Sequence, residues 1–242
     1  MSQRILLGML TPSSNTVLEP VCAAMMADVP KASAHFSRFR VTDISLDEAA
    51  LGQFRMQPMI DAAALLADAH VDAICWNGTS ASWLGLDQDR ALCRAILDAT
   101  GIATTSSVLA LEQIFRKTGV RRFGLVSPYL GSVQERIVQT FRKEGFECAA
   151  ERHLEIRENH AFADVTGDTL RGMVRAVAET RPDAICILCT NLNGAPLVEA
   201  LEAETGIPVY DSVATAIWGA LRAAKKPPDV VKGWGRLFRE VL

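Results

Sequence analysis

The sequence repeats itself once, and this internal similarity constrains the fold more than any other feature. Asp72-Ala73-Ile74-Cys75 recurs as Asp183-Ala184-Ile185-Cys186, and Thr100-Gly101-Ile102 recurs as Thr205-Gly206-Ile207. Gly8-Met9-Leu10-Thr11-Pro12 resembles Gly124-Leu125-Val126-Ser127-Pro128 in the same order. Three similar segments in consistent order indicate a duplicated chain with two related halves.

Short apolar runs alternate with longer amphipathic runs in both halves, which is typical of parallel sheets covered by helices on both faces. Strands are predicted over Arg4–Leu10, Arg38–Ile44, Val71–Trp76, Arg122–Ser127, Cys148–Leu154 and Asp183–Cys189. Helices are predicted over Pro20–Asp28, Pro58–Ala69, Gln88–Thr100, Val108–Thr118, Val133–Glu144, Asp168–Arg181, Pro196–Thr205 and Val213–Ala224.

We therefore expect an α/β fold of two duplicated Rossmann-like (flavodoxin-like) lobes. Their parallel sheets are related by a pseudo-two-fold axis, and the active site lies between them. Residues 1–112 with 215–242 are assigned to the first lobe, and residues 113–214 to the second. The tail from Trp218 to Leu242 is expected to pack back onto the first half.

Composition and charge narrow the class of partner. Apolar residues make up 49% of the chain and its net charge is -3, with no long run of one sign. This argues against a nucleic-acid partner. The apolar run Ile5–Leu10 is too short for a signal peptide, and no stretch is long enough to span a bilayer. We expect a cytoplasmic protein without a membrane partner, able to form a homo-oligomer, whose six cysteines are not paired in disulfides.

Four strand ends are candidates for one shared cleft, because ligands of open parallel sheets bind at the carboxyl ends of strands. Small polar residues that could hold a carboxylate follow each of these strands. The candidates are Pro12, Ser14 and Asn15; Gly78, Thr79 and Ser80; Tyr129; and Cys189, Thr190 and Asn191. Each has a structural alternative: Ser14 and Asn15 could simply cap a helix, Gly78–Ser80 could be an ordinary turn, and Tyr129 could be a packing residue.

Cys189 is the strongest catalytic candidate, because it closes an apolar strand just before the polar turn Thr190–Gly194. Amides at a helix start are expected to stabilise a thiolate there. The alternative is a buried structural cysteine. Cys186 and Cys189 are not interpreted as a metal or redox pair, because both lie on the predicted strand and residues three apart point to opposite faces.

No cofactor is predicted. The four histidines show no metal-ligand spacing, and the chain contains neither a GxGxxG motif nor a Walker loop. Any chemistry would therefore rest on side chains alone.

These motifs resemble the aspartate/glutamate racemase superfamily, and within it the maleate isomerase and arylmalonate decarboxylase branch. Pro12–Thr16 resembles the maleate isomerase N-terminal motif, and Cys189–Leu192 resembles the second catalytic-cysteine motif. Gly78–Ser82 resembles the decarboxylase version of the first motif, in which Gly replaces the first Cys. Ser127-Pro128-Tyr129 through Glu135-Arg136 resembles the segment with the decarboxylase's oxyanion Tyr, and Gly233–Phe238 resembles its C-terminus.

The resemblance implies a cofactor-independent lyase or isomerase whose substrate is a small dicarboxylate. Racemases of this superfamily use two thiols on opposite faces, and maleate isomerases are thought to use the first thiol as a nucleophile. Gly78 can do neither, and Cys75 lies within its strand. The resemblance also implies that Asn15 helps to hold a substrate carboxylate.

Three functions stay open from the sequence. The leading hypothesis is a decarboxylase of small aryl- or alkenylmalonates, in which Thr79, Ser80 and Tyr129 stabilise an enediolate and Cys189 protonates it. The second is a maleate cis-trans isomerase or a racemase-type isomerase. The third is a non-catalytic relative that binds a small acid.

Overall fold

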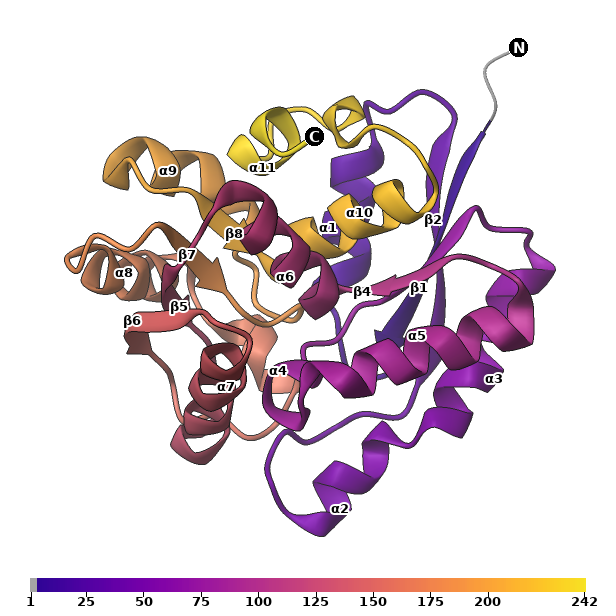
Figure 1. Cartoon of the computed structure of the whole chain (residues 1–242), viewed down its shortest axis with the longest axis horizontal. Helices are drawn as coiled ribbons and strands as arrows, with labels where there is room; N and C mark the ends of the chain where they lie inside the picture. Colours follow the sequence, from indigo (N-terminus) through magenta and orange to yellow (C-terminus); the bar gives the residue numbers. More distant parts are fainter. Residues whose placement is uncertain (1–3) are drawn as a thin grey trace.

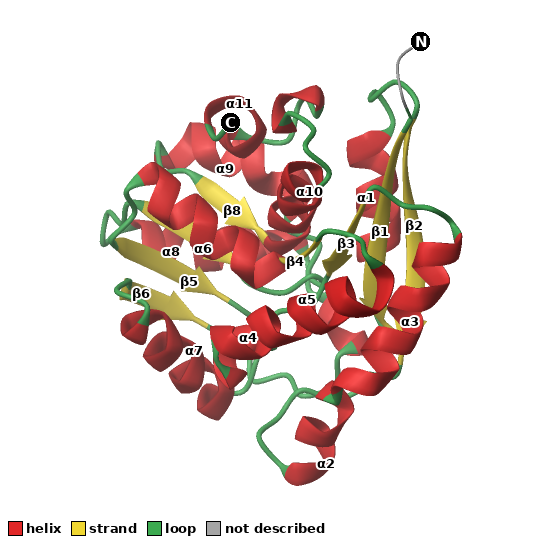
Figure 2. Ribbon diagram, turned by 45° about the vertical axis from the view of Figure 1, so that its right-hand side comes forward, coloured by secondary structure: helices red, strands yellow, loops and turns green. Residues whose placement is uncertain are grey.

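The computed structural model describes residues 4–242, which form two parallel four-stranded sheets with flanking helices (Figures 1 and 2). The first sheet has the order β2-β1-β3-β4, and the second has the order β6-β5-β7-β8. Their strands are β1 (Ile5–Pro12), β2 (Ala32–Phe39), β3 (Ala73–Trp76), β4 (Thr104–Ser106), β5 (Arg122–Val126), β6 (Glu147–Arg152), β7 (Ala184–Ile187) and β8 (Val209–Asp211). The equivalent order in the two sheets confirms the predicted pair of duplicated flavodoxin-like lobes.

Helices cover the sheets on both sides, as the buried central strands require. Every residue of β3 and of β7 is buried, so these strands are apolar on both faces. The α-helices are α1 (Leu18–Met26), α2 (Glu48–Leu51), α3 (Met56–Asp68), α4 (Ala81–Leu84), α5 (Leu86–Thr100), α6 (Ser107–Thr118), α7 (Gly131–Lys143), α8 (Gly167–Ala178), α9 (Val198–Thr205), α10 (Ser212–Ala223) and α11 (Arg236–Glu240). Short 3-10 turns η1–η4 lie at Gly52–Phe54, His160–Asp164, Ala195–Leu197 and Pro228–Val230.

Two helices are exchanged between the halves. Helix α6 follows β4 of the first sheet, but its Phe115 packs against Phe123 of β5 and Phe141 of α7, with ring centroids 5.4 and 6.1 Å apart. Helix α10 follows β8 of the second sheet and contacts β3 and β4 of the first (Figure 2). The two exchanged helices also pack on each other.

The C-terminal tail departs from its expected position in one respect. Helix α10 packs on the first sheet, but α11 contacts β8, and the Arg236 amide donates to Glu202 of α9 at 2.9 Å. The end of the tail therefore lies on the second half. The assignment of residues 1–112 with 215–242 and of 113–214 to two lobes stays a prediction.

One predicted strand was wrong, and two strands were not predicted. The strand expected over Arg38–Ile44 lies earlier, at Ala32–Phe39, and the chain leaves the sheet after Phe39. As an edge strand β2 pairs only with β1, so most of its residues are half-buried and few are aliphatic. Strands β4 and β8 have three residues each, too short to show a pattern. Within residues 4–242, no helix is long and apolar enough to cross a membrane.

Candidate active site

The carboxyl ends of β1, β3, β5 and β7 meet at one small cavity between the two sheets. Of the predicted site residues, the cavity is lined by Pro12, Gly78, Thr79, Ser80, Tyr129, Cys189 and Thr190. Its volume is about 20 Å³, enough for about one water molecule. None of the described residues that line it is Lys, Arg, His, Asp or Glu. The wall is therefore electrically neutral and rich in aromatic side chains.

Cys189 lies two residues beyond the end of β7, and 2% of its surface is exposed. Its Sγ accepts hydrogen bonds from the Asn191 amide at 3.3 Å and from the Tyr129 hydroxyl. These donors lower the pKa of the thiol, but burial outweighs them and raises its pKa to about 12. The stabilised thiolate expected from the sequence is therefore wrong: Cys189 is a neutral thiol, suited to giving a proton.

Tyr129 connects the two halves across the cavity. Its hydroxyl lies 2.5 Å from Thr79 Oγ1 and also hydrogen-bonds with Cys189. Burial raises the pKa of the phenol well above its ordinary value, so the hydroxyl stays protonated and can donate. Thr79 and Ser80 precede the short helix α4, and their carbonyls accept from the amides of its first turn, so that the helix holds this turn in place. Donors from both halves thus surround one point of the wall.

Gly78 occupies the place in the first half that Cys189 occupies in the second. A Cβ built on Gly78 would lie 1.9 Å from Cζ2 and 2.4 Å from Cε2 of the Trp76 indole. The ring is itself held by Phe39, with centroids 5.0 Å apart. Any side chain at position 78 would have to displace this indole. Cys75 cannot supply the second thiol, because it is fully buried outside the cavity wall and its Sγ–H donates to the Trp76 carbonyl.

Ser14, Asn15 and Asn191 lie just outside the cavity wall, and other groups engage their polar atoms. Asn15 Oδ1 accepts from the amides of Val17 and Leu18, which caps α1. Asn191 Oδ1 accepts from the amides of Thr16 and Val17, and its Nδ2 donates to the Asn159 carbonyl at 2.6 Å. Ser14 Oγ donates to the Val41 carbonyl at 2.6 Å. The contacts of Asn191 with Thr16 and Val17 join the two halves. Substrate binding by the three side chains stays a prediction.

Thr190 reaches the cavity wall, but its hydroxyl is engaged on both sides. It donates to the Asn77 carbonyl at 2.9 Å and accepts from Asn15 Nδ2 at 3.1 Å. This pair of bonds fixes the turn after Cys189 to the turn before Gly78. Thr190 therefore orients the two strand ends relative to each other.

The sequence interpretation missed several residues of the cavity wall. They are Val41, Ile44, Phe54, Trp76, Trp83 and Asn159. Trp76 ends β3 and Trp83 lies in α4, so their closeness to a motif could have pointed to them. Val41, Ile44 and Phe54 belong to residues 41–54, which we call the cover segment. No sequence pattern showed that this segment closes the cavity.

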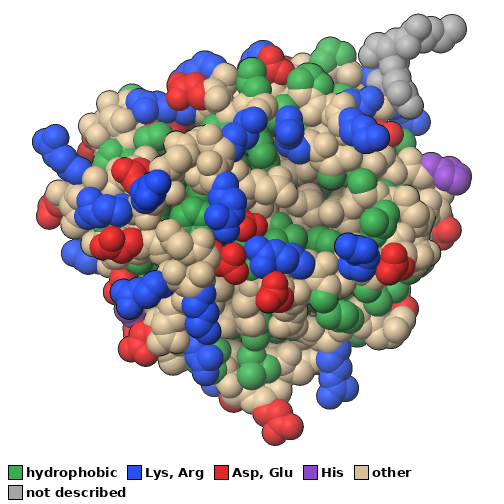
Figure 3. Space-filling model, viewed as in Figure 1, with side chains coloured by type: hydrophobic (Ala, Val, Ile, Leu, Met, Phe, Trp, Pro, Cys, Tyr) green, Lys and Arg blue, Asp and Glu red, His purple; other side chains and the backbone are tan. Residues whose placement is uncertain are grey.

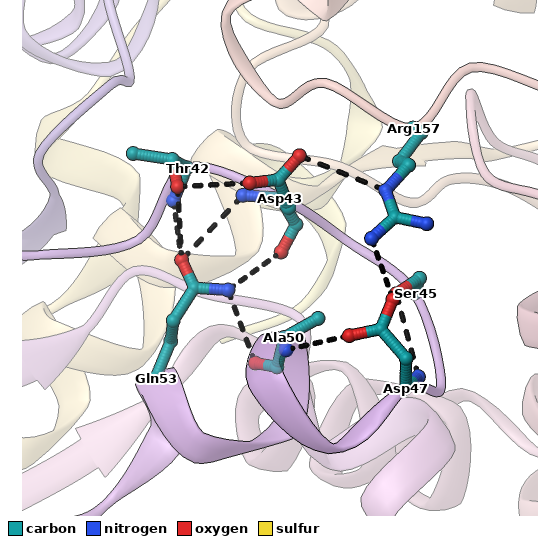
Figure 4. Close-up of polar contacts among 7 residues, drawn as sticks. All are labelled: Thr42, Asp43, Ser45, Asp47, Ala50, Gln53 and Arg157. Atoms are coloured by element: carbon teal, nitrogen blue, oxygen red, sulfur yellow. Dashed lines mark hydrogen bonds and ion pairs between the residues drawn. The ribbon is translucent and has the colours of Figure 1, made fainter.

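Arg157 ties the cover segment to the second half (Figure 4). Its guanidinium pairs with Asp47 at 2.5 Å and with Asp43 at 3.7 Å, and its carbonyl accepts from the Ile44 amide at 3.0 Å. Within the segment, Gln53 bonds with the Thr42 amide and with the Ala50 carbonyl (Figure 4). A dicarboxylate is larger than the cavity, so part of the wall has to move for one to enter, and we expect the cover segment to do so.

The model of one family, described as arylmalonate decarboxylase, matches residues 8–238. The chain belongs to this family. A maleate isomerase from Pseudomonas putida is 30% identical over 98% of this chain and 98% of its own length. The arylmalonate decarboxylase of Bordetella bronchiseptica is 27% identical over 97% of this chain and 96% of its own length.

Solved structures agree with the family assignment. A Nocardia farcinica maleate cis-trans isomerase, a variant with a covalently bound succinylcysteine intermediate, covers 99% of this chain and 100% of its own with a TM-score of 0.90 at 25% identity. Unliganded arylmalonate decarboxylase covers 98% of this chain and 100% of its own with a TM-score of 0.80 at 26% identity. The predicted enzyme of the lyase or isomerase class is thereby confirmed at the level of the family.

The surface around the arylmalonate decarboxylase fold carries mixed charge. On the face drawn in Figure 3, basic and acidic side chains are interspersed over both halves. The net charge of -3 agrees with this distribution. This face therefore carries no broad patch of one sign of charge.

Proposed function

We propose that this protein is a cofactor-independent decarboxylase of small aryl- or alkenylmalonates. The observation that carries the proposal is the single thiol of the cavity. Of the described residues that line it, only Cys189 is a cysteine, and the place of a second thiol is filled by the Trp76 indole over Gly78. A one-thiol site can deliver a proton to one face of a carbanion, whereas a two-thiol racemase needs both faces.

The first step would break the bond between the substrate's central carbon and one carboxylate. That carboxylate lies in the neutral, aromatic part of the wall, where a charge is poorly solvated. It leaves as CO₂, and its bonding electron pair stays on the central carbon as an enediolate. The remaining carboxylate becomes the enediolate oxygens, and the Tyr129 hydroxyl, the Thr79 hydroxyl and the amides before α4 donate to them.

The second step would transfer the Cys189 proton to the central carbon. The S–H bond breaks, a C–H bond forms, and the thiolate is left accepting from Tyr129 and the Asn191 amide. A proton from solvent then restores the thiol, so that one proton is consumed for each CO₂ released. The raised pKa of Cys189, about 12, keeps the thiol protonated before this step. Because the thiol lies on one side only, the product would be a single enantiomer.

Incubation with α-methyl-α-phenylmalonate tests this function. We expect CO₂ release and an optically pure monoacid, because one thiol reaches one face of the carbanion. The Cys189→Ala variant is the negative control. Racemic product from the unaltered protein, or full turnover by Cys189→Ala, would contradict the mechanism.

Maleate cis-trans isomerisation is the second candidate, supported by the 30% identity with the Pseudomonas putida maleate isomerase and the TM-score of 0.90 against the Nocardia farcinica one. Loss of maleate with formation of fumarate, followed by proton NMR, tests it. If maleate is converted and the malonate is not, the isomerase is the function. A cytoplasmic location and a homo-oligomeric state stay predictions of the sequence. The family and the relatives are enzymes, which argues against binding of a small acid without chemistry.

A further inference from the structure

Two indole N–H groups at the cavity have no acceptor. Trp76 and Trp83 line the cavity, with 1% and 5% of their surfaces exposed. In the part of the chain that the structure describes, no acceptor lies within hydrogen-bond distance of either Nε1. The other buried tryptophan differs: Trp218 Nε1 donates to the Val241 carbonyl at 2.6 Å. The unpaired donors therefore belong to the site rather than to the core in general.

Such donors are costly to leave unpaired. A buried Trp N–H usually finds an acceptor, and a buried polar group without one destabilises a fold by about 1–3 kcal/mol. Two such donors in one cavity wall, with no cation beside them, are explained if the bound substrate supplies the acceptors. Carboxylate oxygens would satisfy both, and charge assistance would strengthen the bonds.

The Trp76 ring fills the space that a side chain at position 78 would need. The Trp76 atom nearest but one to a Cβ on Gly78 is Cε2, at 2.4 Å, and Nε1 is bonded directly to Cε2. The atoms nearest to that Cβ are Cζ2, Cε2 and Cη2, so the six-membered ring of the indole lies over position 78, with Nε1 bonded next to it. Trp83 is held between Phe54 and Tyr129, at centroid distances of 6.0 and 5.2 Å. Both rings are thus fixed by aromatic neighbours before substrate arrives.

We propose that Trp76 and Trp83 are substrate-binding residues whose N–H groups donate to substrate carboxylate oxygens, with Trp76 acting where a first thiol would otherwise stand. This inference rests on the proposed function, because it concerns the same cavity and the same class of acid. It adds a second kind of donor to Tyr129, Thr79 and the turn amides. It also assigns a use to the indole that fills the place of the second acid.

The test is an NMR titration of the ¹⁵N-tryptophan-labelled Cys189→Ala protein, which leaves the acid unconverted. The chain has four tryptophans and so gives four indole signals, assigned with single Trp→Phe variants. With phenylmalonate or maleate as the probe, we expect the Trp76 and Trp83 signals to move downfield to saturation, because their protons become hydrogen-bonded. The Trp218 signal, already bonded to Val241, should stay in place and serves as the internal control.

Kinetics of the active protein supply the second readout. Replacing Trp76 with 3-benzothienylalanine keeps the size of the ring but removes the N–H. We expect kcat/KM to fall about 10- to 100-fold, mostly through KM, since a hydrogen bond to a charged group is lost. Trp218→Phe, which loses an N–H bond far from the cavity, should change stability and leave KM within about two-fold.

The outcomes separate this inference from the proposed function. Downfield shifts without turnover of either acid would support hydrogen bonding by the two indoles and refute the proposed enzymatic function. Turnover without shifts, or an unchanged KM in the benzothienyl variant, would refute the role of the two indole N–H groups in binding and leave the proposed enzymatic function intact. Neither shifts nor turnover would refute both.

Discussion

After β3 the chain continues through Asn77 to Gly78, and after β7 it continues through Leu188 to Cys189. The two strands are central in sheets of equivalent order, so the two positions correspond across the pseudo-two-fold axis. One is a bare Cα beneath an indole edge, and the other bears a buried thiol. Duplication thus provides two equivalent backbone positions, and the side chains decide whether acid chemistry is possible from one face or from both.

Removing the Cys189 thiol is expected to have the largest effect on activity. Cys189→Ala is expected to lower kcat by about 10²- to 10⁴-fold, the usual contribution of a positioned proton donor. Rates of CO₂ release from phenylmalonate measure this effect. Cys186→Ala is the matched control, because Cys186 is buried on β7 away from the cavity wall. Equal losses in the two variants would show that the effect is structural.

Adding a side chain to the bare position should also disturb the site. Gly78→Ala is expected to lower stability and kcat/KM, because its Cβ meets the Trp76 ring at 1.9 Å. Combining it with Trp76→Val should restore stability, with a coupling free energy of about 1–3 kcal/mol in urea denaturation. Gly172→Ala in α8 is the control, since a Cβ there meets nothing within 4 Å. Additive effects of the two cavity substitutions would contradict the contact.

The pH profile distinguishes a proton donor from a nucleophilic thiolate. Because the pKa of Cys189 is raised to about 12, the donor form persists through neutral and alkaline pH. We expect kcat to be flat between about pH 7 and 10, whereas a thiolate mechanism would gain up to about ten-fold per pH unit. A stopped assay of CO₂ over this range measures the profile. A continuous rise would point to attack by the thiolate.

Each half also has one fully buried aspartate, Asp89 in α5 and Asp211 at the end of β8, where it caps α10. Burial raises both pKa values to about 7, and one oxygen of each has no hydrogen-bond partner among the described residues. In the folded state these carboxyl groups stay protonated above 3.8, the pKa that they have in the unfolded chain. Their protonation therefore contributes its full stabilisation below about pH 4, and this contribution is lost as the pH rises to about 7. At higher pH the charged carboxylates stay unfavourable.

Substituting these carboxyl groups gives the smallest expected effect. Asp211→Asn and Asp89→Asn should each raise the free energy of unfolding at pH 8 by about 1–3 kcal/mol, and less at pH 5. Asn keeps the oxygen that caps α10 at position 211. Urea denaturation at the two pH values measures the difference. Equal effects at pH 5 and pH 8 would show that titration is not the cause.

The sequence predicted the architecture because duplication leaves repeated strand ends, and the cavity residues Gly78, Tyr129 and Cys189 all follow such ends. The edge strand β2 was misplaced, since its half-buried residues lack an apolar run. The protonation state of Cys189 was missed because burial, which sequence does not give, outweighs the nearby amides.

Other parts of the site depend on contacts between distant segments. Trp76 and Gly78 are two residues apart, yet only the turn of the chain brings the ring over the Cα. The cover segment reaches the cavity through Arg157, about a hundred positions further along, and pairs with its backbone near Glu158. The periodicity of helices and strands in the sequence does not predict such contacts.

The exchange of α6 and α10 makes the two sheets interlocked rather than merely adjacent. Each sheet packs against a helix that follows the last strand of the other sheet. Moving the halves apart would therefore expose aromatic side chains such as Phe115 and Trp218. A large hinge is therefore energetically unfavourable. We expect entry of an acid to need only local movement of the cavity wall, such as that of the cover segment, while the thiol and the indole stay in place.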